Sequence, residues 1–167
     1  VGSELFLRDR SELSHGPSQS IVTEQGATLR SLRHDGVDVV KSFNADQSPA
    51  SSQGQQLLPW PNRIRDGHYT FNGVEQQLAV SEVDRHNAIH GLVAWSRWSL
   101  VEHTDTSVTQ AIRSMARPGW PGTIDVHLTH RLSDTGLAIE VTARNVGTTA
   151  VPFGYCLFNT SPRPRGR

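Results

Sequence analysis

The alternation of apolar and polar residues predicts an all-β protein, built as an antiparallel sandwich or barrel. Several runs alternate with a period of two, and no window of about eleven residues presents a helical apolar face. Short strand-like runs also recur every 8–12 residues or so between Gly and Pro, which is typical of sandwiches and barrels. The 167 residues suffice for one domain, or for an incomplete part of a larger one.

Two hairpins stand out along the chain. Residues 123–128 and 137–143 alternate regularly on either side of a turn-forming cluster, Ser133-Asp134-Thr135-Gly136. Residues 69–71 and 74–78 flank Asn72-Gly73, a pair that favours a type I′ turn because both central residues need a positive φ. Further strands are predicted at residues 20–24, 27–33, 37–40, 98–102, 107–112 and 150–153.

Two segments lack alternation and are predicted to be loops. Residues 46–56 are small and polar, and they lead into residues 57–64, where Pro59 and Pro61 cannot belong to a central strand. A proline-fixed loop at the edge of a core is a common place for binding residues. Residues 83–95 form the second such segment and are rich in side chains that donate and accept hydrogen bonds.

Composition excludes several classes of function. The 16 basic and 16 acidic residues cancel, so the chain lacks the basic field of a nucleic-acid-binding protein. No apolar run approaches the roughly 20 residues that span a bilayer, and no secretory signal is visible. A single cysteine, Cys156, cannot form an internal disulfide. These features predict a cytoplasmic protein without nucleic-acid or membrane partners.

The histidines give no metal site. His127 and His130 lie three apart on a predicted strand, so they point to opposite faces, and both are expected to be solvated. Nucleotide-binding and serine-hydrolase motifs are also absent from the sequence. We therefore expect no metal site and no bound nucleotide.

One constellation remains. The guanidinium of Arg63, the amide of Asn62 and the imidazole of His90 suit vicinal hydroxyl groups, and aromatic faces pack on sugar C–H surfaces. The aromatic candidates are Trp60, Trp95 and Trp120. Taken alone, these residues favour a sugar ligand only weakly over a purely structural role.

Four segments between residues 26 and 155 resemble the aldose 1-epimerase (galactose mutarotase) family. Residues 56–73 are similar to the pattern P-x-x-N-R-I-x-x-G-x-[FY]-x-F-x-G, and residues 87–92 to N-x-[LI]-H-G. Residues 118–122 resemble an aromatic-Pro-Gly turn, and residues 152–155 the beginning of P-F-G-Y-G-x-H-P-Y.

The resemblance implies a galactose-mutarotase-like antiparallel β-sandwich that binds a galactose- or glucose-type hexose without a cofactor. In the implied reaction a carboxylate takes the anomeric proton while a histidine protonates the ring oxygen, and the opened sugar recloses as the other anomer. Asn62 and Arg63 match substrate-binding positions, and His90 matches a catalytic histidine. The structural alternatives are an Arg63–Asp66 ion pair and a His90 that caps carbonyl groups. Trp60 and Trp120 are expected to be half core and half cleft wall.

The resemblance breaks off after Tyr155. The family pattern expects Gly-x-His, whereas this chain has Cys156, Leu157 and Phe158. We therefore expect residues 1–155 to form an incomplete domain, roughly the N-terminal half, and residues 156–167 to form an irregular Pro/Arg-rich tail. The expected activity is impaired, and the alternative is a non-catalytic carbohydrate-binding or remnant protein. Uncovered sheet edges would then allow self-association.

Overall fold

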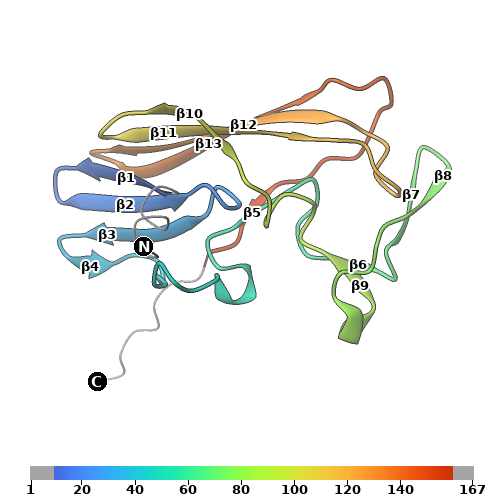
Figure 1. The fold of residues 1–167 in the computed structure, drawn as a ribbon, viewed down its shortest axis with the longest axis horizontal. Helices are drawn as coiled ribbons and strands as arrows, with labels where there is room; N and C mark the ends of the chain where they lie inside the picture. The colour runs from blue at the N-terminus through green and yellow to red at the C-terminus, as the bar shows by residue number, and fades with distance from the viewer. Residues whose placement is uncertain (1–9, 160–167) are drawn as a thin grey trace, which may run out of the picture.

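The computed structural model describes residues 10–159, which form two four-stranded antiparallel sheets and three smaller strand pairs. The first sheet contains β1 (Arg10–His15), β2 (Ser18–Thr23), β3 (Leu29–His34) and β4 (Val37–Asp38), in that order. The second contains β10 (Ser99–His103), β11 (Ser107–Ser114), β12 (Ile124–Ser133) and β13 (Gly136–Asn145). Figure 1 shows the second sheet extending across the molecule above the first.

The two sheets pack face to face through apolar side chains on their inner faces. Leu13 and Val22 of the first sheet share a buried cluster with Val108 and Leu132 of the second. A second cluster joins apolar residues of β12 to Leu58, Val93 and Trp98. This arrangement confirms the predicted all-β antiparallel sandwich, in which β1, β2 and β12 bury every second side chain.

The predicted hairpins are present. β12 and β13 pair from Ile124↔Asn145 to Ser133↔Gly136. β7 (His68–Phe71) and β8 (Val74–Gln77) enclose Asn72 and Gly73, with φ values of 50° and 77° as a type I′ turn requires. The other predicted strands lie wholly or partly in β2, β3, β4, β10 and β11. Residues 150–153 are not a strand, because Pro152 has no N–H for a ladder and Val151 packs against the cluster around Trp120.

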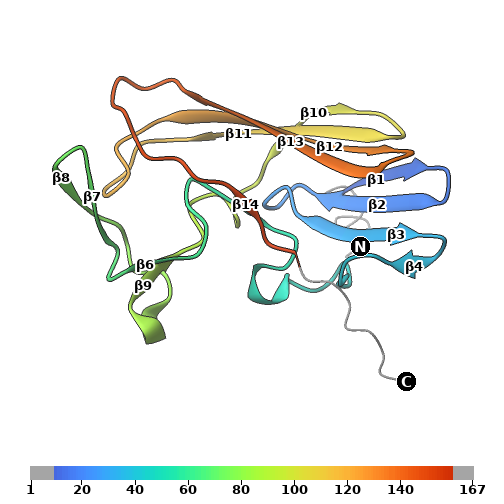
Figure 2. The same cartoon turned by 180° about the vertical axis from the view of Figure 1, so that it is seen from behind.

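The two segments predicted to be loops contain short strands that pair with distant partners. β6 (Arg63–Arg65) pairs with β9 (Asn87–Ile89), and β5 (Gln56–Leu57) pairs with β14 (Cys156–Leu157). Two short 3-10 turns, η1 (Ala50–Ser52) and η2 (Val83–Arg85), lie in the same segments. From behind, β14 is seen running beneath the second sheet toward the first (Figure 2). Regular pairing thus reaches Leu157, while residues 160–167 of the predicted tail lie outside the described residues.

His130 is not solvated as expected. The alternation of β12 places His127 on the exposed face, but it places His130 on the same face as Leu128 and Leu132, with 0% of its surface exposed. Burial lowers the pKa of His130 to about 4, because the charged imidazole loses its hydration there.

Within residues 10–159, no helix is long and apolar enough to cross a membrane.

Candidate functional site

The pairing of β6 with β9 brings the Asn62-Arg63 motif next to His90. Asn62 precedes β6, His90 follows β9, and Arg63 stands opposite Ile89 in the register. The backbone N–H of His90 donates to the Asn62 carbonyl at 3.0 Å. In return, the backbone N–H of Asn62 donates to Nδ1 of His90 at 3.2 Å. The two motifs, 28 residues apart, therefore hold each other in place.

Both residues have left-handed backbone conformations, with φ of 59° at Asn62 and 63° at His90. A positive φ is uncommon for residues other than glycine, although asparagine and histidine adopt it more often than most, and the surroundings keep both residues in place. Gly91 follows with φ of 75°, and a Cβ at this position would overlap the Leu58 carbonyl. The chain therefore makes a tight left-handed turn that leaves the His90 ring beside β6.

The hydrogen bond to Nδ1 defines which tautomer the neutral His90 ring adopts. Because Nδ1 accepts from a backbone N–H, the proton of the neutral imidazole is carried by Nε2. Burial lowers the pKa of His90, and the nearby positive charge of Arg63 lowers it further. His90 is thus a neutral side chain at pH 7 that offers one N–H donor.

The guanidinium of Arg63 makes a bidentate ion pair with Glu82. Nε donates to Oε2 and Nη2 to Oε1, each at 2.7 Å. Glu82 also accepts from the amide of Asn87 at 2.9 Å. The hydrogen bond from Arg63, followed by that from Asn87, lowers the pKa of Glu82 to about 2.

Sequence reasoning missed Glu82. The alternative it offered was Asp66, but Arg63 pairs with Glu82 instead, and Nη1 of Arg63 donates to Asn62 Oδ1 at 3.3 Å. The signal available in the sequence was indirect, because Asn87, the first residue of the second motif, contacts the same carboxylate.

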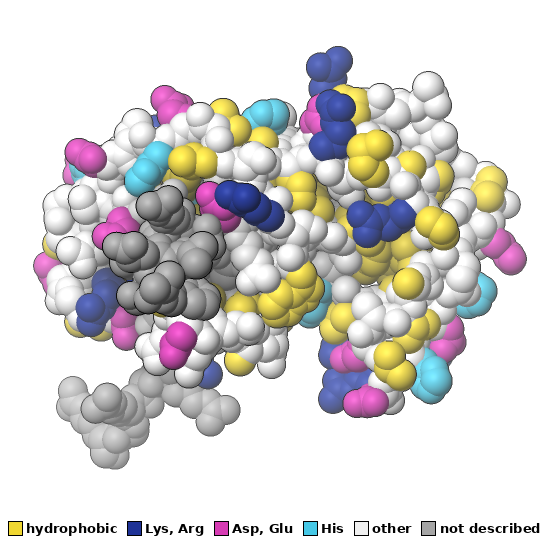
Figure 3. All heavy atoms as spheres, in the orientation of Figure 1, with side chains coloured by type: hydrophobic (Ala, Val, Ile, Leu, Met, Phe, Trp, Pro, Cys, Tyr) yellow, Lys and Arg dark blue, Asp and Glu magenta, His cyan; other side chains and the backbone are white. Residues whose placement is uncertain are grey.

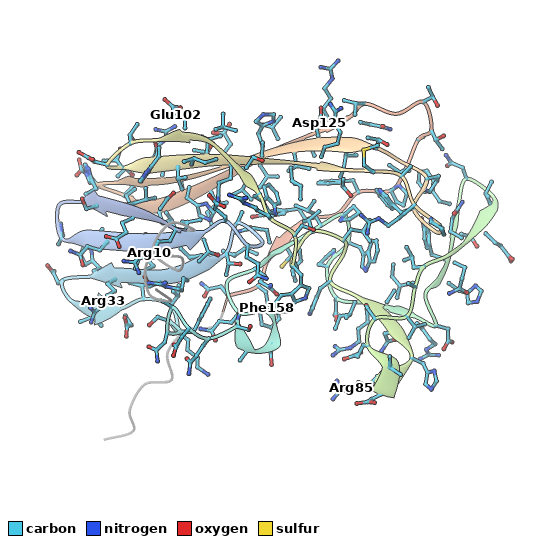
Figure 4. The ribbon with its side chains drawn as sticks, in the orientation of Figure 1. Arg10, Arg33, Arg85, Glu102, Asp125 and Phe158 are labelled. Carbon is cyan, nitrogen blue, oxygen red and sulfur yellow. The ribbon has the colours of Figure 1, made fainter. Side chains whose placement is uncertain are left out.

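Phe158 lies against His90, with ring centroids 5.8 Å apart and planes at 57°. Its backbone is tied to the segment before β5, since Gly54 N–H donates to Phe158 O at 2.6 Å and Phe158 N–H donates to Gln55 O at 3.1 Å. Figure 4 shows Phe158 between the β1–β4 sheet and the part that carries β6 and β9. The residue that replaces the pattern's second histidine thus faces the first.

A cavity of about 180 Å³ opens beside His90. It is lined by Ser52, Ser81, Ile89, His90, Gly91, Leu92, Ala94 and Trp95. The surface is hollowed between the part that carries β1–β4 and the part that carries β6–β9, with hydrophobic side chains along the hollow (Figure 3).

The three tryptophans have different positions. Trp95 is 57% exposed and lines this cavity. Trp60 packs against Trp120 at a centroid distance of 6.2 Å. Trp120 is only 1% exposed in its own small core cluster, so it forms core and not the cleft wall that was expected. The indole of Trp120 is buried because the turn that carries it folds back onto Leu78 and Ala88.

The sequence model of aldose 1-epimerase matches residues 9–157. The chain belongs to the aldose 1-epimerase family. The uncharacterized protein YihR of Escherichia coli (strain K12) is 36% identical over 143 residues, which is 85% of this chain and 46% of YihR. This chain spans about half the length of the curated relatives that it matches.

Solved structures agree on the fold. An aldose epimerase homologue from C. elegans superimposes with a TM-score of 0.72 at 23% identity, covering 81% of this chain and 46% of the homologue. A galactose mutarotase-like protein from Clostridium acetobutylicum gives a TM-score of 0.71 at 19% identity, covering 82% of this chain and 46% of that protein.

Within residues 10–159, no group of three or more His, Cys, Asp or Glu side chains could hold a metal ion.

Proposed function

We propose that the protein binds aldohexoses at Asn62, Arg63 and His90 and serves the interconversion of their α and β anomers. The observation that carries this proposal is the reciprocal hydrogen bonding of Asn62 and His90, which places a neutral imidazole donor beside a fixed guanidinium. A hexose offers matching groups. Its ring oxygen accepts one hydrogen bond, and two neighbouring hydroxyl groups accept hydrogen bonds from the planar pair of N–H donors on a guanidinium.

Anomer interconversion requires two proton movements, one from the C1 hydroxyl and one to the ring oxygen. In this proposal, Nε2–H of His90 donates to the ring oxygen, while Arg63 and the Asn62 amide orient the hydroxyls. A neutral imidazole positions the ring oxygen better than it protonates it. Glu82 is a poor base for the C1 hydroxyl, because its pKa is about 2 and both oxygens already accept hydrogen bonds.

Phe158 favours a second candidate function for this 167-residue chain, which is carbohydrate binding without catalysis. A phenyl ring cannot transfer a proton, and it faces His90 at the position where the family pattern has a histidine. Loss of one general acid typically costs a factor of about 10²–10⁴ in rate. Since mutarotation also proceeds in plain water, we expect the chain to add little to the background rate.

A polarimetric time course on freshly dissolved α-anomer tests the catalytic side of the proposal. We expect the 167-residue chain to leave the rate close to the buffer value. We expect Phe158→His to raise it by protonating the ring oxygen while solvent water takes the proton of the C1 hydroxyl. Clear acceleration by the unaltered chain would show that another group carries the proton transfers.

Calorimetric titration with galactose and glucose tests the binding side. We expect Arg63→Ala and His90→Ala each to weaken hexose binding by about tenfold or more, since each removes a direct hydrogen bond. Arg65→Ala is the matched control, because Arg65 lies on the same strand and is exposed. Equal affinities for the unaltered chain, Arg63→Ala and His90→Ala would rule out this site.

A further inference from the structure

A second cavity, of about 470 Å³, lies between the first sheet and the loop at residues 43–49. Three arginines line it, Arg10 from β1, Arg30 from β3 and Arg97 from the segment before β10. The acidic side chains in its lining are Glu24 and Asp46. Figure 4 shows Arg10 over the strands of the first sheet. The proposed hexose site uses none of these residues.

Arg30 enters the cavity because the sheet is irregular at that point. Val22 of β2 stands opposite Leu29 and Ile21 stands opposite Ser31, so Arg30 has no partner in the register. An extra residue of this kind is a β-bulge, which re-aims a side chain relative to its neighbours on the strand. Leu29 remains in the core, while Arg30 lines the cavity.

The guanidinium of Arg30 is buried without a direct ion-pair partner among residues 10–159. Arg30 is only 9% exposed, and no hydrogen bond or ion pair joins its guanidinium to any residue in the range 10–159. Burial is the main cause that lowers its pKa, the positive charge of Arg10 adds to it, and the negative charge of Glu12 opposes both. The two other arginines are paired, Arg10 with Glu12 and Arg97 with Glu24. A buried charge is costly unless it is paired, so this guanidinium is suited to an anionic ligand.

We propose that this cavity binds a small oxyanion, a phosphate or a carboxylate group, through Arg30. A guanidinium offers a planar fork of N–H donors that matches two oxygens of either group. Thr23, Thr28 and Ser48 also line the cavity. Trp95 lines both this cavity and the one at His90. Because Trp95 adjoins both cavities, we assign the oxyanion to a substituent of the sugar, and this last step rests on the proposed hexose site.

Calorimetric titration with inorganic phosphate at constant ionic strength tests the anion site alone. We expect the unaltered chain to bind phosphate, Arg30→Gln to weaken binding about tenfold or more, and Arg30→Lys to weaken it less, because lysine keeps the charge but loses the fork of two donors. Arg33→Gln is the control, because Arg33 lies on the same strand, is exposed and pairs with Asp38. Circular dichroism verifies that each variant is folded. Absence of binding to the unaltered chain, or unchanged binding by folded Arg30→Gln, would overturn the anion site.

The sugar arm compares glucose 6-phosphate with inorganic phosphate and with glucose. We expect the sugar phosphate to bind more tightly than either, and His90→Ala to reduce its affinity to that of inorganic phosphate. Equal affinities for sugar phosphate and inorganic phosphate would overturn the assignment to a sugar substituent and leave a site for a free anion. Phosphate binding does not require His90. If only the hexose site fails, phosphate still binds and the sugar phosphate binds no more tightly; if the anion site fails, phosphate does not bind.

Discussion

Two histidines illustrate how single residues acquire their roles from the backbone around them. His90 is partly buried at a turn, where a backbone N–H fixes its Nδ1 as an acceptor. His130 is wholly buried in β12, where Gln56 donates to its Nε2 at 3.4 Å and its Nδ1 has no partner among residues 10–159. The pKa values of both are lowered mainly by burial. The sequence pattern distinguished His90 through its motif, but the core position of His130 follows from the alternation of β12.

We expect His130 to make stability depend on pH between about 4 and 6.5. The unfolded chain binds a proton near pH 6.5, whereas the folded chain binds it only near pH 4. Stability is therefore complete above pH 6.5 and is lost as the pH falls through this window, by on the order of 3 kcal/mol.

Urea unfolding at several pH values measures this effect, with His130→Gln as the comparison. The variant lacks the titrating group, so its stability should vary less across the same window. An identical slope for both proteins would contradict the assignment.

Glu82→Gln tests whether the carboxylate positions Arg63. The ion pair lies at the surface, so the free energy of unfolding should fall only slightly. Hexose affinity should fall more clearly, since the guanidinium loses its bidentate anchor. Glu75→Gln, on exposed β8, is the control. Calorimetric titration measures the hexose affinity, and urea unfolding measures the stability of the same variants. An unchanged hexose affinity in Glu82→Gln would argue against a positioning role of Glu82.

At the level of elements, the sequence predicted what is local and missed what is long-range. The hairpins β7–β8 and β12–β13 are visible because alternation and a turn signal lie side by side in the chain. β5, β6, β9 and β14 have only two or three residues each, which is too short for a period to be recognised. Their pairing depends on partners far along the chain, so the motif resemblance, and not the pattern, located the candidate site.

Two glycines give a matched test of these elements. Gly73 has φ of 77° in the β7–β8 turn with open space around it, so Gly73→Ala should cost about 1 kcal/mol. Gly91 has a similar φ of 75°, but a Cβ there would overlap the Leu58 carbonyl. That carbonyl accepts a hydrogen bond from Leu92 N–H, which connects the chain after β9 to the chain after β5.

Gly91→Ala should therefore cost more than Gly73→Ala and should also weaken hexose binding. Thermal unfolding and calorimetric titration measure the two effects. Equal costs for both variants, with hexose binding unchanged in each, would show that Gly91 does not shape the site.

At the level of the whole molecule, each four-stranded sheet is bounded by two outer strands within residues 10–159. β10 and β13 are the outer strands of the second sheet. β13 is ten residues long, and its Ile139 and Val141 are only partly buried against the core. A long edge strand with partly exposed apolar residues tends to pair with another copy. The sequence predicted such edges from the resemblance alone.

We expect the 167-residue chain to self-associate through β13 as its concentration rises. Ala143→Lys should suppress this association, since Ala143 is exposed on the face shared by Ile139 and Val141, and a charge there opposes edge pairing. Sedimentation velocity over a concentration series measures the change. The matched control is Glu140→Gln on the opposite face. Association that is identical in the Ala143→Lys variant would exclude the β13 edge.

The pairing of β14 with β5 has a consequence for the order of events during synthesis. Tyr155 donates its hydroxyl hydrogen to Gln56 Oε1 across a separation of 99 residues, and Phe158 binds the backbone just before β5. The hairpins can form as they leave the ribosome, because their contacts are close in sequence. The ring that faces His90 arrives only after residue 158 has emerged. A ribosome halted before that residue would therefore hold a nascent chain whose sheets can pair but whose His90 still lacks its aromatic neighbour.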